Sequence, residues 1–250
     1  STGISMSATR TIFAVSALLL VIGNANAEFI GFKIGAQATS QGSGTSSIDI
    51  VDDLGTEQTE QSSMILILEH PIAVLPNVRY QGYSLDSTDN RSAMDEGSFN
   101  GNALNAANGA ATSFDLNHDD VVLYYQLLNN WIDLDMGVDL KRFDGQVSAI
   151  DPTAGNVDVD ETIPLLHLSA RVALPLSGLY VGADINANFI DLGITNSSAQ
   201  DSTLMLGYDS GNGLGIRGGI KSFSLQLNDA NTVNTDLEYD GLFLNGYYNF

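Results

Sequence analysis

The stretch from Ile132 to Lys141 reads IDLDMGVDLK, and its pattern decides the fold class. Every second residue from Ile132 to Leu140 is a large apolar side chain. The residues between them are Asp133, Asp135, Gly137, Asp139 and Lys141. Successive side chains of a β-strand point to opposite faces of a sheet, so a period of two predicts a strand. This strand has one apolar face and one charged face.

The same period of two recurs along the whole chain, in ten segments. They lie at about 29–38, 62–69, 78–85, 114–128, 132–141, 162–174, 179–189, 202–208, 214–227 and 235–250. In the ninth segment the apolar parity changes between Ile220 and Phe223, which predicts a β-bulge near Ser222.

The connections between these segments alternate in length. Short connections span 70–77, 129–131, 175–178 and 209–213, and long ones span 39–61, 86–113, 143–161, 191–201 and 228–234. Bacterial outer-membrane barrels have an even number of strands, short periplasmic turns and longer extracellular loops. A soluble β-sandwich, the alternative, has no reason to keep this order. We therefore predict an all-β fold, a closed antiparallel transmembrane β-barrel of about ten strands with this arrangement of turns and loops.

The charged faces of the strands would line the lumen of such a barrel. In lipid every strand edge must be paired, so the sheet closes with an apolar exterior. A ten-stranded barrel is only a little wider than the eight-stranded barrels that side chains just fill. We expect opposite charges inside it to pair and to plug the lumen. The predicted lumen network comprises Lys33, Arg79, Asp120, Asp133, Asp135, Asp139, Lys141, His167, Arg171, Asp184, Arg217 and Lys221.

Aromatic residues near the short connections predict a girdle at the periplasmic membrane boundary. These residues are Phe29, Tyr80, Trp131, Tyr180, Tyr248 and Phe250.

The first residues predict an export signal. Arg10 supplies a positive start, residues 12–22 form a short apolar run, and Ala25-Asn26-Ala27 is a small-x-small cleavage site. The run is shorter than the about 20 residues of a membrane-spanning helix. A buried N-terminal helix is the alternative. The predicted organisation is 1–27 as upstream residues plus a cleaved signal peptide, and 28–250 as the outer-membrane β-barrel.

Composition excludes several classes of function. The 250 residues include 30 Asp and Glu against 9 Lys and Arg, for a net charge of −21. Such a chain repels phosphate groups, so we expect no nucleic-acid partner. Without cysteine there is no thiol chemistry and no zinc site built on cysteine. The surplus acids lie mainly in the long connections, which predicts an acidic outer rim.

The densest acidic cluster is Asp158-Val159-Asp160-Glu161. Carboxylates suit Ca²⁺ or Mg²⁺, but the fixed spacing of an EF-hand is absent. We therefore predict solvated loops, no metal site and no cofactor. Divalent ions that bridge these loops to lipopolysaccharide are a weaker alternative.

The last segment carries a family resemblance. Leu242, Leu244, Gly246, Tyr248 and Phe250 occupy every second position and end on a terminal Phe. This resembles the C-terminal strand signal that the barrel-assembly machinery of Gram-negative bacteria recognises. The layout of 28–250 resembles small proteobacterial outer-membrane β-barrel proteins, and the pair Gly218-Gly219 resembles an uncharacterised family named for such a pair.

The resemblance implies a place and a set of partners, and it brings no known activity. The expected location is the cell outer membrane of a Gram-negative bacterium, reached by signal-peptide-directed export. The expected partners are outer-membrane lipid, lipopolysaccharide and, during biogenesis, the barrel-assembly machinery. We expect a monomer.

Two histidines are candidates for catalysis. His118-Asp119-Asp120 resembles the arrangement of omptin-type outer-membrane proteases, in which His and Asp activate a water molecule, although other omptin motifs are absent. His167 lies two residues from Ser169 on one strand face, which makes them neighbours but not evidently a hydrolase dyad. The parity of His167 is inward, whereas outer-membrane lipid hydrolases use residues that face the lipid. The glycines from Gly213 to Gly218 match a dinucleotide fingerprint but lead into a strand rather than a helix.

We therefore predict no enzymatic activity. The first expectation is a barrel with a structural or surface-interaction role. The alternative is a narrow, porin-like channel for small solutes or cations, which the acidic mouth would attract. An omptin-like protease is a distant third.

Overall fold

The computed structural model describes residues 31–41, 44–48, 51–56, 60–89, 97–99, 102–104, 111–150, 156–188, 197–228 and 234–250. The predicted signal peptide, Phe29 and many of the predicted acidic loop residues lie outside this part of the chain. In the described part, no helix is both long and apolar enough to cross a membrane.

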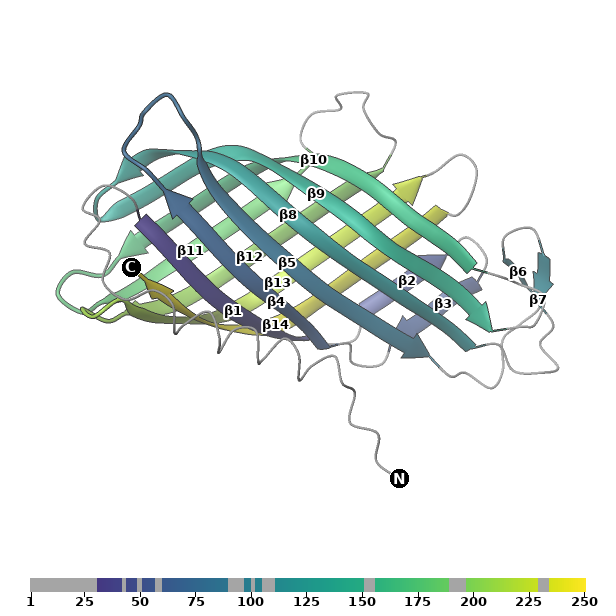
Figure 1. The fold of residues 1–250 in the computed structure, drawn as a ribbon. Helices are drawn as coiled ribbons and strands as arrows, with labels where there is room; N and C mark the ends of the chain where they lie inside the picture. The colour runs from purple at the N-terminus through teal and green to yellow at the C-terminus, as the bar shows by residue number, and fades with distance from the viewer. Residues whose placement is uncertain are drawn as a thin grey trace.

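Ten of the twelve strands in the main sheet form a closed ring (Figure 1). Each strand pairs with the next in antiparallel fashion, and the first also pairs with the last, so the ring has no open edge at that level. This confirms the predicted all-β, closed antiparallel barrel of about ten strands. In ring order the strands are β1 (Gly31–Gln41), β4 (Glu60–Glu69), β5 (Asn77–Asp89), β8 (Ala111–Asn129), β9 (Ile132–Ile150), β10 (Asn156–Ala173), β11 (Leu179–Ala187), β12 (Ser198–Asp209), β13 (Leu214–Asn228) and β14 (Asn234–Asn249).

Four shorter strands lie in connections that the sequence predicts as loops. β2 (Gly44–Ile48) and β3 (Val51–Thr56) form a hairpin that pairs with the early part of β14. β6 (Gly97–Phe99) and β7 (Asn102–Leu104) form a separate hairpin. Both hairpins lie at the same end of the barrel (Figure 1). We call this the loop end, and we call the opposite end, which carries the short connections and the C-terminus, the turn end.

The turns at the turn end depend on local backbone geometry. Gly213 precedes β13 with a φ of 90°, a left-handed conformation that favours glycine. A Cβ at this position would also lie 2.5 Å from the carbonyl oxygen of Asn249, so no larger residue fits without movement. Gly213 thus allows the turn to close beside the end of the last strand.

The strands near the loop end are longer than predicted. β9 continues to Ile150 and β10 begins at Asn156, so most of the predicted connection 143–161 is paired strand. β12 likewise begins at Ser198, inside the predicted connection 191–201. These segments are rich in polar residues, which resemble a loop in sequence although their backbone groups continue the ladder.

The predicted bulge at Ser222 is wrong. The register of β13 passes through Ser222 without a break on both sides, opposite Ser202 on β12 and Asp240 on β14. A register shift is found instead in β8, between Gln126 and Leu128. The change of apolar parity at Phe223 therefore needs another explanation.

That explanation is an inversion of polarity along the barrel wall. In the half nearer the turn end, here the lower barrel, large apolar residues face outward and are exposed, as at Leu123, Val138, Leu206 and Leu244. In the half nearer the loop end, here the upper barrel, apolar residues face inward. Phe143, Ile163, Leu165, Phe223 and Leu225 are all buried there and form what we call the upper apolar cluster. Outward neighbours in this half are exposed polar residues, including Arg142, Asp144, Thr162 and Gln226.

Candidate functional site

The lumen contains the candidate site, since the inward faces of the ten strands converge there. Strand register and burial place all the residues of the predicted lumen network on inward faces. They do not form one network. They divide into a buried ion cluster near the upper barrel, a middle level, and a partly exposed group at the turn end.

The ion cluster is centred on Lys141 of β9. Its Nζ lies 2.7 and 2.8 Å from the two carboxylate oxygens of Asp120 and 2.7 Å from Asp201. Lys221 of β13 lies 3.3 Å from the other oxygen of Asp201. The four side chains are only 0–7% exposed. Charges that are this far from water are stable only when paired, so the cluster is a fixed element of the interior.

Aromatic rings cross the lumen beside this cluster. His118 of β8 stacks on Phe223 of β13, with ring centroids 5.8 Å apart and an interplanar angle of 16°. In ring order these two strands are five positions apart, which is directly opposite in a ring of ten. Tyr83 stacks on His118 at 4.3 Å, and the Lys221 Nζ lies 4.2 Å from the centre of the Tyr83 ring. Side chains from opposite walls are therefore in contact at this level.

The middle level holds charged groups with less complete pairing. Nδ1 of His167 lies 2.6 Å from the side-chain oxygen of Asn186. Asp139 is fully buried, and within the described residues neither of its carboxylate oxygens has a hydrogen-bond partner. The same holds for Nε of Arg79. A cavity of about 30 Å³, lined by Arg79 and Asp184 among others, has room for only a few water molecules.

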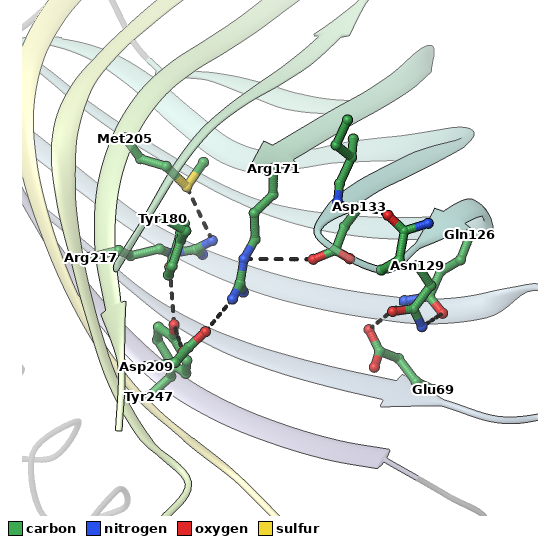
Figure 2. A network of polar contacts seen from close by, with 12 residues as sticks. Glu69, Gln126, Asn129, Asp133, Arg171, Tyr180, Met205, Asp209, Arg217 and Tyr247 are labelled. Atoms are coloured by element: carbon green, nitrogen blue, oxygen red, sulfur yellow. Dashed lines mark hydrogen bonds and ion pairs between the residues drawn. The ribbon is translucent and has the colours of Figure 1, made fainter. Parts of the chain in front are cut away.

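The turn-end group is centred on Arg171 (Figure 2). Its guanidinium lies between Asp133, at 3.6 Å, and Asp209, with which it forms a close ion pair. It also lies over the ring of Tyr180, 3.8 Å from the ring centre. Tyr247 donates its hydroxyl proton to Asp209, and the hydroxyl of Tyr180 lies 3.0 Å from that of Tyr247. The charged side chains here are 29–36% exposed, so solvent reaches the lumen from the turn end.

Glu69 and Arg217 make further contacts at this end of the lumen, and Figure 2 shows Glu69 beside Gln126 and Arg217 beside Met205. Glu69 accepts hydrogen bonds from the Tyr124 hydroxyl at 3.0 Å and from the Gln126 amide at 3.4 Å. Arg217 donates to the side-chain oxygen of Asn245 at 3.1 Å. A cavity of about 60 Å³ lies between these groups, and Lys33, Arg171, Asp184 and Arg217 are among its lining residues.

The catalytic arrangements considered from the sequence are not assembled by these residues. His118 is buried in the lumen, whereas Asp119 faces outward and accepts a hydrogen bond from Tyr80 at 2.7 Å. Asp120 is held by Lys141. His167 contacts Asn186. Among the described residues, no group of three or more His, Asp or Glu side chains is placed to hold a metal ion.

The C-terminal residues lie on the outward face of β14. Leu242 and Leu244 are exposed, and a Cβ added at Gly246 would meet nothing within 4 Å. The ring of Phe250 packs edge-on against the ring of Tyr248, with centroids 4.6 Å apart. The backbone N–H of Phe250 donates to the carbonyl oxygen of Phe32. The end of the chain is thus bonded to the start of β1.

One aromatic prediction is wrong. Tyr180 does not belong to an exterior girdle, because its side chain is buried in the lumen beside Tyr247. The residue follows the turn before β11 at the parity of Asp184, and that parity is inward.

Several lumen residues are not predicted by the sequence. Asp201 lies in a predicted loop, and Asp209 lies in a predicted turn. Glu69 and Tyr247 carry a usable signal, since each continues the inward parity of its strand. Tyr83 follows Arg79 and Gln81 at the same parity, but an aromatic residue gives no indication of a charged lumen by itself.

Comparison with known proteins shows likeness of fold only. No family model matches the chain, and no curated protein matches it. Similar solved structures include the translocator domain of the autotransporter NalP from Neisseria meningitidis, with 12% identity over 98% of this chain and 96% of that chain and a TM-score of 0.43. They also include Neisserial surface protein A, with 10% identity over 88% and 97% and a TM-score of 0.36. A Pseudomonas aeruginosa FadL homologue has 9% identity over 88% and 90% and a TM-score of 0.36. The function is therefore argued from this chain's own wall and lumen.

Proposed function

We propose that the chain is an integral outer-membrane β-barrel with a closed lumen, and that it serves as a structural or surface-interaction protein rather than as an enzyme. The exterior of the lower barrel supports membrane insertion. On β9 the outward residues from Ile132 to Leu140 are apolar, and this stretch of nine residues matches the 9–11 residues with which a tilted strand crosses a bilayer. In water so broad an exposed apolar surface would promote aggregation.

The observation that carries the closed lumen is the contact between His118 and Phe223 across the barrel. The ion cluster around Lys141 lies at the same level, and its four charged side chains are almost inaccessible to solvent. An ion that entered from the turn end would have to separate both sets of contacts to pass. This supports a barrel whose wall and loops, rather than a pore, carry the function.

Conductance across a planar bilayer tests this proposal. Purified protein inserted into the bilayer should give no steady openings. The double variant His118→Ser with Phe223→Ser removes both rings that meet across the lumen, and it should raise the conductance if the folded barrel is inserted. Steady cation-selective openings of the unmodified protein would overturn the closed lumen.

The second candidate function is a narrow channel for cations. The specific observation in its favour is the set of acids at the solvent-reached turn end, where Asp133 and Asp209 are partly exposed. The ion cluster would then be a gate instead of a permanent closure. The distant alternative, an omptin-like protease, predicts that His118→Ala abolishes peptide cleavage, whereas our proposal predicts no cleavage before or after the change.

The proposed location is the outer membrane of a Gram-negative bacterium. The proposed partners are outer-membrane lipid, lipopolysaccharide and, during biogenesis, the barrel-assembly machinery. The proposed oligomeric state is a monomer. The proposed family is that of the small proteobacterial outer-membrane barrels, which the sequence resembles. A folded barrel of this kind should migrate differently on a detergent gel before and after heating. Recovery in the soluble periplasmic fraction without such a shift would contradict the location.

A further inference from the structure

The connection between β4 and β5 differs in composition from the turn between β12 and β13 at the same end of the barrel. Residues 70–76 read HPIAVLP, whereas residues 210–213 read SGNG. Ile72 is 53% exposed, Val74 80% and Leu75 51%. Figure 1 shows this connection standing out from the wall at the turn end. Three aliphatic side chains are thus presented outward on a single short segment.

The segment is held in this shape by its own hydrogen bonds. The N–H of Ile72 donates to Nδ1 of His70 at 3.2 Å, so Nε2 of the same ring carries the proton and donates to the carbonyl oxygen of Pro76 at 3.0 Å. The N–H of His70 donates to the side chain of Asn77, and the N–H of Leu75 donates to the carbonyl oxygen of Ile72. The exposure of the aliphatic side chains is therefore a property of an ordered turn.

The segment also bends toward the outer wall. The hydroxyl of Tyr125 on β8 donates to the carbonyl oxygen of Val74 at 3.2 Å. Tyr125 faces outward, between the exposed residues Leu123 and Leu127. The aliphatic residues of the segment are thus continuous with the apolar exterior of the lower barrel.

We propose that the segment His70–Pro76 inserts Ile72, Val74 and Leu75 into the lipid bilayer, at the boundary between acyl chains and headgroups of the leaflet nearest the turn end. This inference rests on the proposed membrane location. The segment carries no Lys, Arg, Asp or Glu, and its single polar ring is engaged with its own backbone. Such a surface fits the interface, where apolar side chains enter the lipid while backbone groups stay near the headgroups. The segment acts as an anchor beside the barrel wall.

Site-specific fluorescence tests the anchor. Since the chain contains no cysteine, Val74→Cys gives a single labelling site without further changes. The protein is labelled with a polarity-sensitive fluorophore and reconstituted into phosphatidylcholine vesicles that contain lipids with a nitroxide either near the headgroup or deep in the acyl chain. Leu123→Cys, on the lower barrel wall, is the lipid control, and Asn212→Cys, in the polar turn before β13, is the water control.

The emission at Val74→Cys should be shifted to the blue of Asn212→Cys, and the shallow nitroxide should quench it more than the deep one. If Val74→Cys behaves like Asn212→Cys while Leu123→Cys is quenched, the anchor is refuted and the segment is left as a site for a protein partner. If Leu123→Cys itself reports water, the proposed membrane barrel fails as well. Heat-dependent migration on a gel verifies folding of each variant, and Ile72→Cys replaces Val74→Cys if the latter does not fold.

Discussion

Lys141→Met is the most informative change in the lumen, because it removes one charge while it keeps the length of the side chain. The Nζ of Lys141 is the cation closest to Asp120 and to Asp201. After the change Asp201 retains Lys221 at 3.3 Å, but Asp120 loses both of its contacts at 2.7 and 2.8 Å. The lumen then contains a buried carboxylate without a cation beside it.

The size of the effect follows from this burial. Removing one partner of a buried ion pair costs about 3–5 kcal/mol of unfolding free energy, because the remaining charge stays desolvated. The value for Lys141→Met should lie in this range. A second change, Asp120→Asn, should return much of the loss, since it removes the orphaned charge.

The matched control is the next residue along β9. Arg142 faces outward, 3.6 Å from Asp160 and 3.9 Å from Asp144, and its side chain is 56% exposed. A solvent-exposed pair of this kind contributes about 0–1 kcal/mol, so Arg142→Met should be nearly neutral. The two variants remove the same charge from adjacent positions on opposite faces of one strand.

The assay is equilibrium unfolding in urea with the protein in lipid vesicles. The single tryptophan, Trp131, reports the transition through its fluorescence, and gel migration reports it independently. Equal midpoints and slopes for Lys141→Met and Arg142→Met would refute the argument, because they would show that the ion cluster contributes no more than an exposed pair.

Three further changes, one of them with a matched control, test the packing and the exterior of the barrel. Phe223→Ala should lower the unfolding free energy by about 3–5 kcal/mol, since it empties a buried aromatic site in the upper barrel, and a shift of the urea midpoint measures this. Leu206→Arg should lower the unfolding free energy in vesicles by about 2–4 kcal/mol, because this outward residue, 56% exposed in the isolated chain, would place a charge in lipid. An unchanged urea midpoint would contradict membrane contact at this position. Gly219→Ala should impair folding, since its Cβ would lie 1.9 Å from the carbonyl oxygen of Leu204, whereas Gly246→Ala should leave the yield of heat-modifiable protein unchanged because nothing lies within 4 Å.

The sequence predicts the lower barrel well because one physical rule operates there. Wherever the strand separates lipid-like surroundings from a polar interior, period-two alternation gives both the strand and its inward face, as from Ile132 to Lys141. The same rule misleads above Ser222. There the surroundings are exchanged: Phe223 has the opposite parity to the outward Ile220 and so faces inward, where apolar residues are buried.

The lumen contacts were harder to predict than the lumen faces. Parity assigns Lys141 to the interior beside Asp120 on the adjacent strand. Its second partner, Asp201, lies equally close but is three strands away in the ring. That pairing depends on barrel closure and on the relative stagger of strands, which no local pattern records. The contact of His118 with Phe223 depends on closure in the same way.

If the barrel lies in a membrane as proposed, the inversion of polarity along its wall sets its depth there. Exposed Arg142 and Asp144 follow directly on the last outward leucine of β9, so the strand cannot sink further without bringing charge into lipid. The remaining residues of β9, to Ile150, then rise about 25 Å above the bilayer at the usual strand rise and tilt. In the proposed membrane location, the upper barrel, with its apolar interior and polar exterior, would stand in water on the same strands that cross the bilayer in the lower barrel. A partner that bound the described ends of β9 and β10 at the loop end would therefore lie well clear of the headgroups.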